Sequence, residues 1–155
     1  MNYLNRLLTL LILFCAAFTI QAQSEDYRLK DVPFTVEYYY KIKWGHFDEF
    51  MDLYMKNHWP SITAAVESGD FLSAKIDRPF NHVGESDRWD VRITVVCKNA
   101  LIALGLDGFD MDAENKRLYP DQETWKKEEQ RRFELIDEHM DVQIYEAESI
   151  SYDQK

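Results

Sequence analysis

The fold of this chain is decided by the stretch Phe34-Thr35-Val36-Glu37-Tyr38-Tyr39-Tyr40-Lys41-Ile42-Lys43-Trp44. Aromatic or branched residues occupy every second position from Phe34 to Trp44, and the positions between them are mainly charged or hydroxyl-bearing. Alternation with a period of two is typical of a strand that buries one face. The pattern predicts a strand over residues 34–44, which ends at Gly45.

The hydrophobic period becomes helical between His46 and Glu67. Pro60 has no amide hydrogen and restricts Trp59 before it, so we expect two helical pieces with a break between them, the second ending near Gly69. One face carries the residues at helical spacing, which are Phe47, Phe50, Met51, Tyr54, His58 and Ile62.

The remaining elements follow from the same two periods. We expect a strand at 71–76, a hairpin loop at 77–87 and a strand at 88–97, with Trp89 on its apolar face. Asn99 is a suitable N-cap for a short apolar stretch, 100–106. A polar insertion, 107–120, precedes a helix at 122–140 and a last strand at 142–150. The inner face of that helix would consist of Trp125, Phe133, Ile136 and Met140.

The order strand, helix, strand, strand, helix, strand predicts an α+β fold, the ferredoxin-like βαββαβ sandwich. Its four-stranded antiparallel sheet would have helices on one face. The strands at 34–44 and 88–97 are the longest and most apolar, so we expect them to be central.

The first 22 residues are typical of a secretory signal peptide. They have a short polar start with Arg6, an apolar run from Leu7 to Ile20 and a small residue, Ala22, at the expected cut. An uncleaved anchor is the alternative, although the run is shorter than the ~20 apolar residues of a membrane span. The expected organisation is a signal peptide at 1–22, a flexible leader at 23–33, one domain at 34–150 and a tail at 151–155. The protein would be exported, to the periplasm or the cell exterior.

The exported part is acidic. The segment 1–22 holds one of the 18 basic residues and none of the 28 acidic ones, which leaves the remaining 133 residues with a net charge of −11. This charge argues against a nucleic-acid partner and against an anionic membrane surface. Cys97 is the only cysteine outside the signal and lies in an apolar run, so we expect a buried thiol and no internal disulfide.

Three motifs resemble the dimeric α/β-barrel superfamily, and most closely its NIPSNAP-like secreted bacterial branch. They are Tyr38-Tyr39-Tyr40-Lys41-Ile42-Lys43-Trp44-Gly45, Asp48-Glu49-Phe50 and Lys56-Asn57-His58-Trp59-Pro60. The resemblance covers roughly residues 34–150, and the insertion at 107–120 is its main departure.

The resemblance implies a homodimer in which two sheets meet face to face, and a ligand cavity between sheet and helices. The face of the central strands that carries Glu37 and Arg92 is mixed in character, and these two residues could pair there; a monomer with a hydrated sheet face is the alternative. Superfamily members include oxygenases for aromatic substrates and haem proteins. No catalytic set is carried over, because the Asn, Trp and His set of the haem-degrading enzymes has no match here.

The strongest candidate site surrounds His58, on the apolar face of the first helix. The expected ligand-binding residues for a small apolar or aromatic ligand are Tyr38, Tyr40, Asn57, His58 and Trp89. If the protein is an enzyme, His58 would act with Tyr40 and Trp59. No cofactor is predicted, although an imidazole among aromatic rings is also suited to haem iron. The alternative is a core histidine bonded to a neighbour.

A second constellation is formed by His46, His82 and His139, which the expected topology brings to one edge of the sheet. Three histidines with nearby carboxylates can bind zinc or copper, but exposed loop histidines are the default because no two have close ligand spacing. We therefore predict no metal site.

The leading functional hypothesis is an exported ligand-binding or interaction module without assigned chemistry. One alternative is a cofactor-poor or haem-linked oxygenase that acts on a small aromatic ligand. Another is an acidic subunit for a basic protein partner. A cavity of roughly 300 Å³ or more beside His58 would favour a ligand site over a filled core.

Overall fold

The computed structural model describes residues 32–81 and 84–144. The signal peptide predicted at 1–22, most of the leader and the tail at 151–155 lie outside these residues. The sheet consists of β1 (Phe34–Ile42), β2 (Phe71–Asp77), β3 (Val91–Cys97) and β4 (Ile136–Ile144). Its strand order is β2-β3-β1-β4 with antiparallel pairing throughout, so β1 and β3 are central as predicted.

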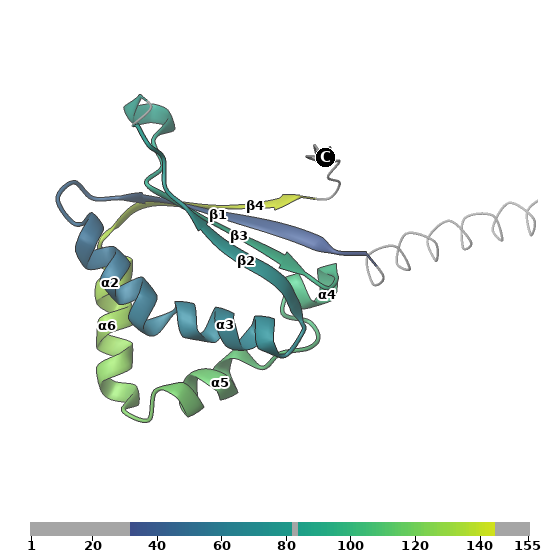
Figure 1. The fold of residues 1–155 in the computed structure, drawn as a ribbon. Helices are drawn as coiled ribbons and strands as arrows, with labels where there is room; N and C mark the ends of the chain where they lie inside the picture. Colours follow the sequence, from purple (N-terminus) through teal and green to yellow (C-terminus); the bar gives the residue numbers. More distant parts are fainter. Residues whose placement is uncertain (1–31, 82–83, 145–155) are drawn as a thin grey trace, which may run out of the picture.

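The helices cover one face of the sheet, as predicted (Figure 1). They are α2 (Phe47–Asn57), α3 (Trp59–Glu67), α4 (Ala100–Ala103), α5 (Met111–Leu118) and α6 (Gln122–Glu134). A short 3-10 helix, η1 (Glu85–Asp87), lies on the opposite side of the sheet (Figure 1). We call the face toward the helices the inner face and the other the outer face. Within the described residues, no helix is long and apolar enough to cross a membrane.

The inner face of the sheet forms the core. Alternate residues of β1 and β3 pair across the sheet: Tyr40 and Val91 belong to the core cluster that contains Phe50 of α2, whereas Val36 packs with Phe34 and Ala100 in a smaller cluster. Cys97 is part of this core, as predicted, and burial raises the pKa of its thiol to about 11.

The predicted break near Pro60 is confirmed. The helical segment divides at His58 into α2 and α3, and Pro60 lies in the first turn of α3, where a missing amide hydrogen costs little. The Asn99 cap is also confirmed, because the Asn99 side chain accepts a hydrogen bond from the Ile102 amide at 3.0 Å.

The predicted helix at 122–140 is wrong in its last turns. Helix α6 ends at Glu134, and β4 occupies Ile136–Ile144 rather than 142–150. Residues Phe133, Ile136 and Met140 fit a helical period, but Ile136 and Met140 also fit the alternation of a strand, and pairing with β1 prevails. Phe133 and Met140 are 55 % and 56 % exposed, so neither packs in the buried core as was expected.

Three smaller predictions also need correction. β1 ends at Ile42, and Trp44 is 64 % exposed instead of continuing the apolar face. β3 begins at Val91, so Trp89 precedes the strand. No helix was predicted within the polar insertion, but α5 forms there. The Asp110 side chain caps this helix by accepting a hydrogen bond from the Ala113 amide.

Candidate functional site

A cavity of about 310 Å³ lies between the inner face of the sheet and the helices. Its polar lining comes from β1, α2, α6 and β4, and includes the break between α2 and α3. The volume is at the lower end of the ~300–1,000 Å³ range of small-molecule sites. The lining residues are Tyr38, Tyr40, Tyr54, His58, Ile62, Phe71, Val95, Met111, Arg132, Phe133 and His139.

A continuous chain of ring contacts connects the two histidines of this cavity. The His139 ring stacks on Tyr40 with centroids 4.3 Å apart, Tyr40 meets Tyr54 edge-on at 5.9 Å, and Tyr54 meets His58 edge-on at 5.0 Å. Contacts of this kind fix ring orientation as well as contributing burial. The strand spacing places Tyr38 and Tyr40 on the same face, and the i, i+4 spacing of α2 places Tyr54 beside His58.

The tyrosine hydroxyls are the unusual feature of the cavity. Tyr40 and Tyr54 are 4 % and 1 % exposed, yet neither hydroxyl forms a hydrogen bond to another described residue, and the same holds for Tyr38. These oxygens are not among the buried, unsatisfied atoms of the described residues, so they open into the cavity, where a ligand or water can accept from them. Burial raises the pKa of Tyr40 to about 12 and also raises that of Tyr54, so both remain protonated hydrogen-bond donors at neutral pH.

His58 is neutral at pH 7. Burial, followed by the positive charge of Arg132, lowers its pKa to about 4. Its Nδ1 lies 3.8 Å from Oε2 of Glu129, and Arg132 holds the Glu129 carboxylate through two hydrogen bonds, Nε to Oε1 at 3.0 Å and Nη2 to Oε2 at 2.7 Å. A buried arginine on α6 therefore orients the carboxylate that faces His58.

His139 was expected at the end of the last helix, and instead it lies within β4 opposite Tyr40. Its Nε2 lies 3.0 Å from Oδ1 of Asp141, and burial lowers its pKa. The wrong boundary of α6 caused this error. His139 belongs to the cavity, which the sequence pattern did not show.

Two of the five predicted ligand-binding residues lie elsewhere. The buried Asn57 side chain donates to Oε2 of Glu128 at 2.8 Å, so it joins α2 to α6 and does not line the cavity. Trp89 meets Tyr39 edge-on at 5.8 Å on the outer side of the sheet. Trp59, proposed as a partner of His58, packs against the core instead of lining the cavity.

The predicted absence of a metal site stays a prediction. His82 lies outside the described residues, and His46 contacts Glu49 at 3.3 Å on the surface, far along the chain from His139 in β4. Among residues 32–81 and 84–144, no group of three histidine, cysteine, aspartate or glutamate residues is placed to bind a metal ion.

The cavity does not fit haem. Its volume of about 310 Å³ suits a ligand of one or two rings rather than a porphyrin. The described residues that line it include a buried arginine and three tyrosines around His58, so a large macrocycle would have to displace the ring chain itself.

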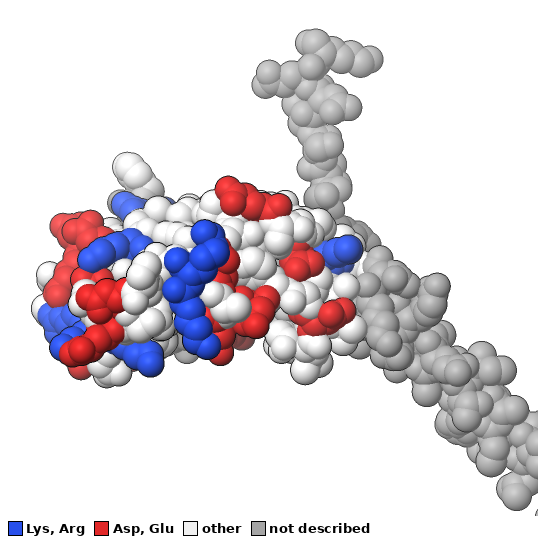
Figure 2. All heavy atoms as spheres, turned by 90° about the horizontal axis from the view of Figure 1, so that it is seen from below, with Lys and Arg blue, Asp and Glu red and all other residues white. Residues whose placement is uncertain are grey.

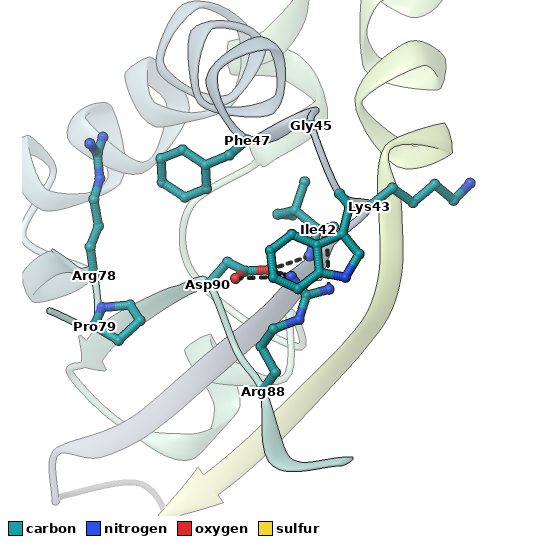
Figure 3. Close-up of a pocket in the computed structure, with 9 residues that line it drawn as sticks. Ile42, Lys43, Gly45, Phe47, Arg78, Pro79, Arg88 and Asp90 are labelled. Atoms are coloured by element: carbon teal, nitrogen blue, oxygen red, sulfur yellow. Dashed lines mark hydrogen bonds and ion pairs between the residues drawn. The ribbon is translucent and has the colours of Figure 1, made fainter. Parts of the chain in front are cut away.

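A second hollow, of about 390 Å³, lies where β1 ends (Figure 3). Within it, Asp90 accepts a hydrogen bond from the Ile42 amide at 2.7 Å, and Arg88 donates to the Ile42 carbonyl at 3.0 Å. Arg88 lies 3.2 Å from Asp90 and stacks over the Trp44 ring at 4.1 Å. These buried charges bind the chain's own backbone, and we regard them as structural.

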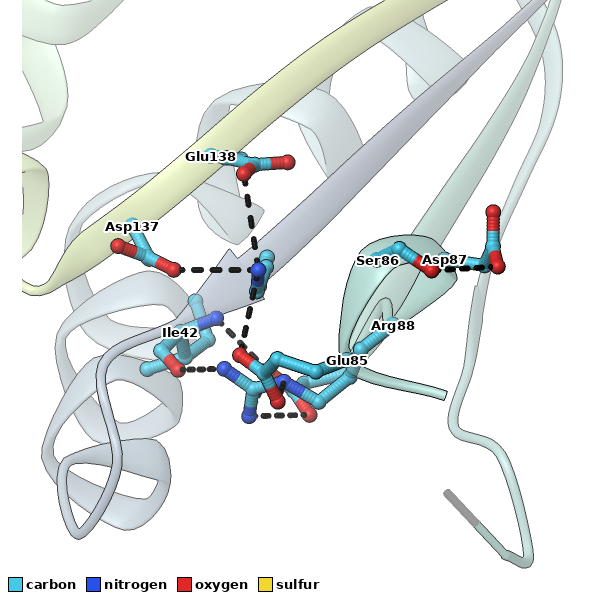
Figure 4. Close-up of polar contacts among 9 residues, drawn as sticks. Ile42, Glu85, Ser86, Asp87, Arg88, Asp137 and Glu138 are labelled. Atoms are coloured by element: carbon cyan, nitrogen blue, oxygen red, sulfur yellow. Dashed lines mark hydrogen bonds and ion pairs between the residues drawn. The ribbon is translucent and has the colours of Figure 1, made fainter. Parts of the chain in front are cut away.

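A cluster of ion pairs anchors η1 to the sheet (Figure 4). The buried Lys41 ammonium lies 3.2 Å from Glu85 of η1, 3.4 Å from Asp137 and 3.5 Å from Glu138. One side chain of β1 thus joins η1 and β4. The predicted pairing of Glu37 with Arg92 on the outer face is also present, at 3.6 Å.

Comparison with known proteins shows similarity in fold. No family model matches the chain, and no curated protein matches it in sequence. A dimeric ferredoxin-like protein from an uncultured marine organism is 6 % identical with a TM-score of 0.55, covering 80 % of this chain and 96 % of its own. A hydroxynitrile lyase from Passiflora edulis is also 6 % identical, with a TM-score of 0.50 and coverage of 78 % and 99 %.

A NIPSNAP family protein from Agrobacterium tumefaciens is 15 % identical with a TM-score of 0.40, covering 75 % of this chain and 94 % of its own. At these identities a likeness establishes architecture and no chemistry. The observed topology and the marine protein's solved structure confirm the fold predicted from sequence: the chain has a ferredoxin-like α+β fold, with a four-stranded antiparallel sheet and helices on one face.

Proposed function

We propose that this protein is an exported, homodimeric module that binds a small, largely apolar or aromatic ligand in the cavity beside His58. The observation that carries the proposal is a cavity of about 310 Å³ into which the hydroxyls of two otherwise buried tyrosines, Tyr40 and Tyr54, open without a hydrogen bond to any described residue. Each hydroxyl can donate to a ligand or to water in the cavity, and a hydrogen bond of this kind contributes about 0.5–1.5 kcal/mol.

The chemistry of the lining narrows the ligand class. Apolar side chains such as Phe71, Val95 and Ile62 exclude water from much of the wall, and the stacked rings suit a planar ligand. The tyrosine hydroxyls require at least one acceptor, such as a carbonyl or phenolic oxygen. A one- or two-ring ligand with one oxygen substituent meets both requirements.

The outer face supports a homodimer. A hollow of about 500 Å³ lies between η1 and this face, with Tyr39, Trp89 and the exposed Met140 in its lining. The Thr94 hydroxyl, at the centre of the outer face, is buried without a hydrogen bond in the described part of the chain. A second copy placed sheet to sheet covers these groups, and the similar protein from the marine organism is described as dimeric.

Nothing specific favours an acidic subunit for a basic partner. On the face shown in Figure 2, acidic and basic side chains are interspersed rather than segregated. Many are already paired with each other, including Lys127 with Glu123 at 2.7 Å and Arg131 with Glu49 at 2.7 Å. Mixed charges of this kind are typical of an ordinary solvated surface.

Titration of the purified protein with 2-naphthol, followed by calorimetry, tests the proposal. This probe is planar, has two rings and carries one hydroxyl. We expect saturable binding that weakens about 2- to 10-fold in Tyr54→Phe, which corresponds to one lost hydrogen bond. The matched control is Tyr119→Phe, because the Tyr119 hydroxyl donates to the Lys56 carbonyl on the surface. Equal affinities for the two variants, or no binding, would contradict the proposal.

A further inference from the structure

The cavity contains the parts that a proton-transfer reaction requires. A neutral imidazole lies at one end of the ring chain, with the Glu129 carboxylate 3.8 Å from its Nδ1. Arg132 fixes this carboxylate through two hydrogen bonds. Because Glu129 lies on the Nδ1 side, it favours the tautomer that carries its proton on Nδ1 and leaves the Nε2 lone pair free. Contacts of this type are often long without ligand and shorten when it binds.

The same cavity also offers stabilisation for a negatively charged oxygen. Tyr54 contacts His58, and Tyr40 contacts Tyr54, so two tyrosines whose hydroxyls have no hydrogen bond to a described residue line the same cavity as the base. The Arg132 guanidinium lines the cavity too, and its Nη1 makes no hydrogen bond to another described residue. Donors that are already in place around a cavity are an arrangement that stabilises an oxyanion.

We propose that the cavity is a cofactor-independent proton-transfer site for a small cyclic or aryl ketone, in which His58 is the base and Tyr40 and Tyr54 hold the enolate oxygen. The inference rests on the proposed function, because the ketone must occupy the same cavity. Its carbonyl oxygen would be the acceptor that the tyrosine hydroxyls lack.

The reaction balances without a further reactant. Nε2 of His58 removes a proton from the carbon next to the carbonyl group, and the C–H electron pair becomes the C=C bond of an enolate. The negative charge moves to oxygen, where the tyrosine hydroxyls donate hydrogen bonds, and Glu129 faces the imidazolium. The imidazolium then returns the proton to the same carbon or to a conjugated one, which gives exchange or isomerisation. A weak base is sufficient when the enolate oxygen is hydrogen-bonded in this way.

Deuterium exchange at C1 of 2-tetralone, followed by proton NMR in D₂O, tests the inference. We expect the protein to exchange these protons faster than buffer does. His58→Gln should lower the rate about 100-fold or more, and Tyr54→Phe, which keeps its ring contacts, about 10- to 100-fold. The matched control is His46→Gln, because His46 is a surface histidine near the start of α2 and should leave the rate unchanged.

Binding of 2-tetralone, measured in the same samples by saturation-transfer NMR, separates this inference from the proposed function. Saturable binding without exchange above buffer would overturn the proton-transfer site and leave the ligand site intact. The same conclusion would follow if His58→Gln and His46→Gln exchanged equally fast. If neither 2-tetralone nor 2-naphthol bound, both proposals would fall.

Discussion

Asp90→Asn tests whether the buried ion pair at the end of β1 holds the sheet together. Asparagine has nearly the same size and retains an oxygen that can accept from the Ile42 amide, which is now 2.7 Å from the Asp90 carboxylate. The substitution therefore removes mainly the negative charge beside Arg88. The guanidinium then remains buried, with Glu85 at 3.3 Å on an exposed side chain as its other carboxylate.

The cost follows from these partners. Removing one member of a buried ion pair costs about 3–5 kcal/mol when the other charge is left uncompensated. Glu85 and the Trp44 ring, 4.1 Å from the guanidinium, compensate part of that charge. We expect Asp90→Asn to lower the free energy of unfolding by about 2–3 kcal/mol.

Urea unfolding followed by far-UV circular dichroism measures this difference. Asp87→Asn is the matched control, since Asp87 is exposed in η1 and should change stability by less than about 0.5 kcal/mol. The denaturant slope should be the same in both variants. If Asp90→Asn were as stable as the control, the assignment of a structural role to this pair would be refuted.

Three further predictions concern acid stability, thiol reactivity and assembly. The pKa of His58 is about 4 in the folded protein, against an ordinary value of 6.5. As the pH drops from about 6.5 toward 4, the unfolded state takes up a proton that the folded state does not, so the free energy of unfolding should fall. The urea midpoints at pH 7 and pH 5 should therefore differ less in His58→Gln than in the unchanged protein. The Cys97 thiol, buried and with its pKa raised to about 11, should react with Ellman's reagent only as fast as the protein unfolds, and immediate labelling in native buffer would contradict its burial. Light scattering should give the mass of a dimer for the unchanged protein and the mass of a monomer for Met140→Arg, which changes the outer face. The control, Leu106→Arg, changes an exposed residue outside the strands and should remain a dimer. A monomer mass for all three proteins would count against sheet-to-sheet assembly.

Most of the fold could be predicted because single periods dominate its long elements. The alternation through β1 has no competing helical pattern. Pro60 cannot donate a backbone hydrogen bond, so the break between α2 and α3 had to lie close to it. The end of α6 could not be located in the same way. Ile136 and Met140 satisfy both periods, and only pairing with β1, a contact distant in sequence, decides between them.

The candidate site was predicted in part for the same reason. Tyr38, Tyr40 and His58 follow from element faces, and the structure places all three around one cavity. His139 was predicted to lie at the end of a helix, and for this reason it was grouped with His46 and His82 as a candidate metal ligand. It lies instead in β4. Arg132 was hidden because a buried arginine on a highly charged helix has the same pattern as an exposed one, and only its position against Glu129 and Tyr54 distinguishes it.

The segment 107–120 contributes part of the cavity lining and is not part of the sheet. Met111, at the start of α5, lines the cavity, while the helix is attached by side-chain contacts such as Ser61 with Asn115 and Tyr119 with the Lys56 carbonyl. No strand pairing depends on the length of this segment. Insertions, deletions or substitutions here can therefore change the size of an accepted ligand while the core remains intact. In evolutionary terms, one wall of the cavity can vary independently of the core that forms its other walls.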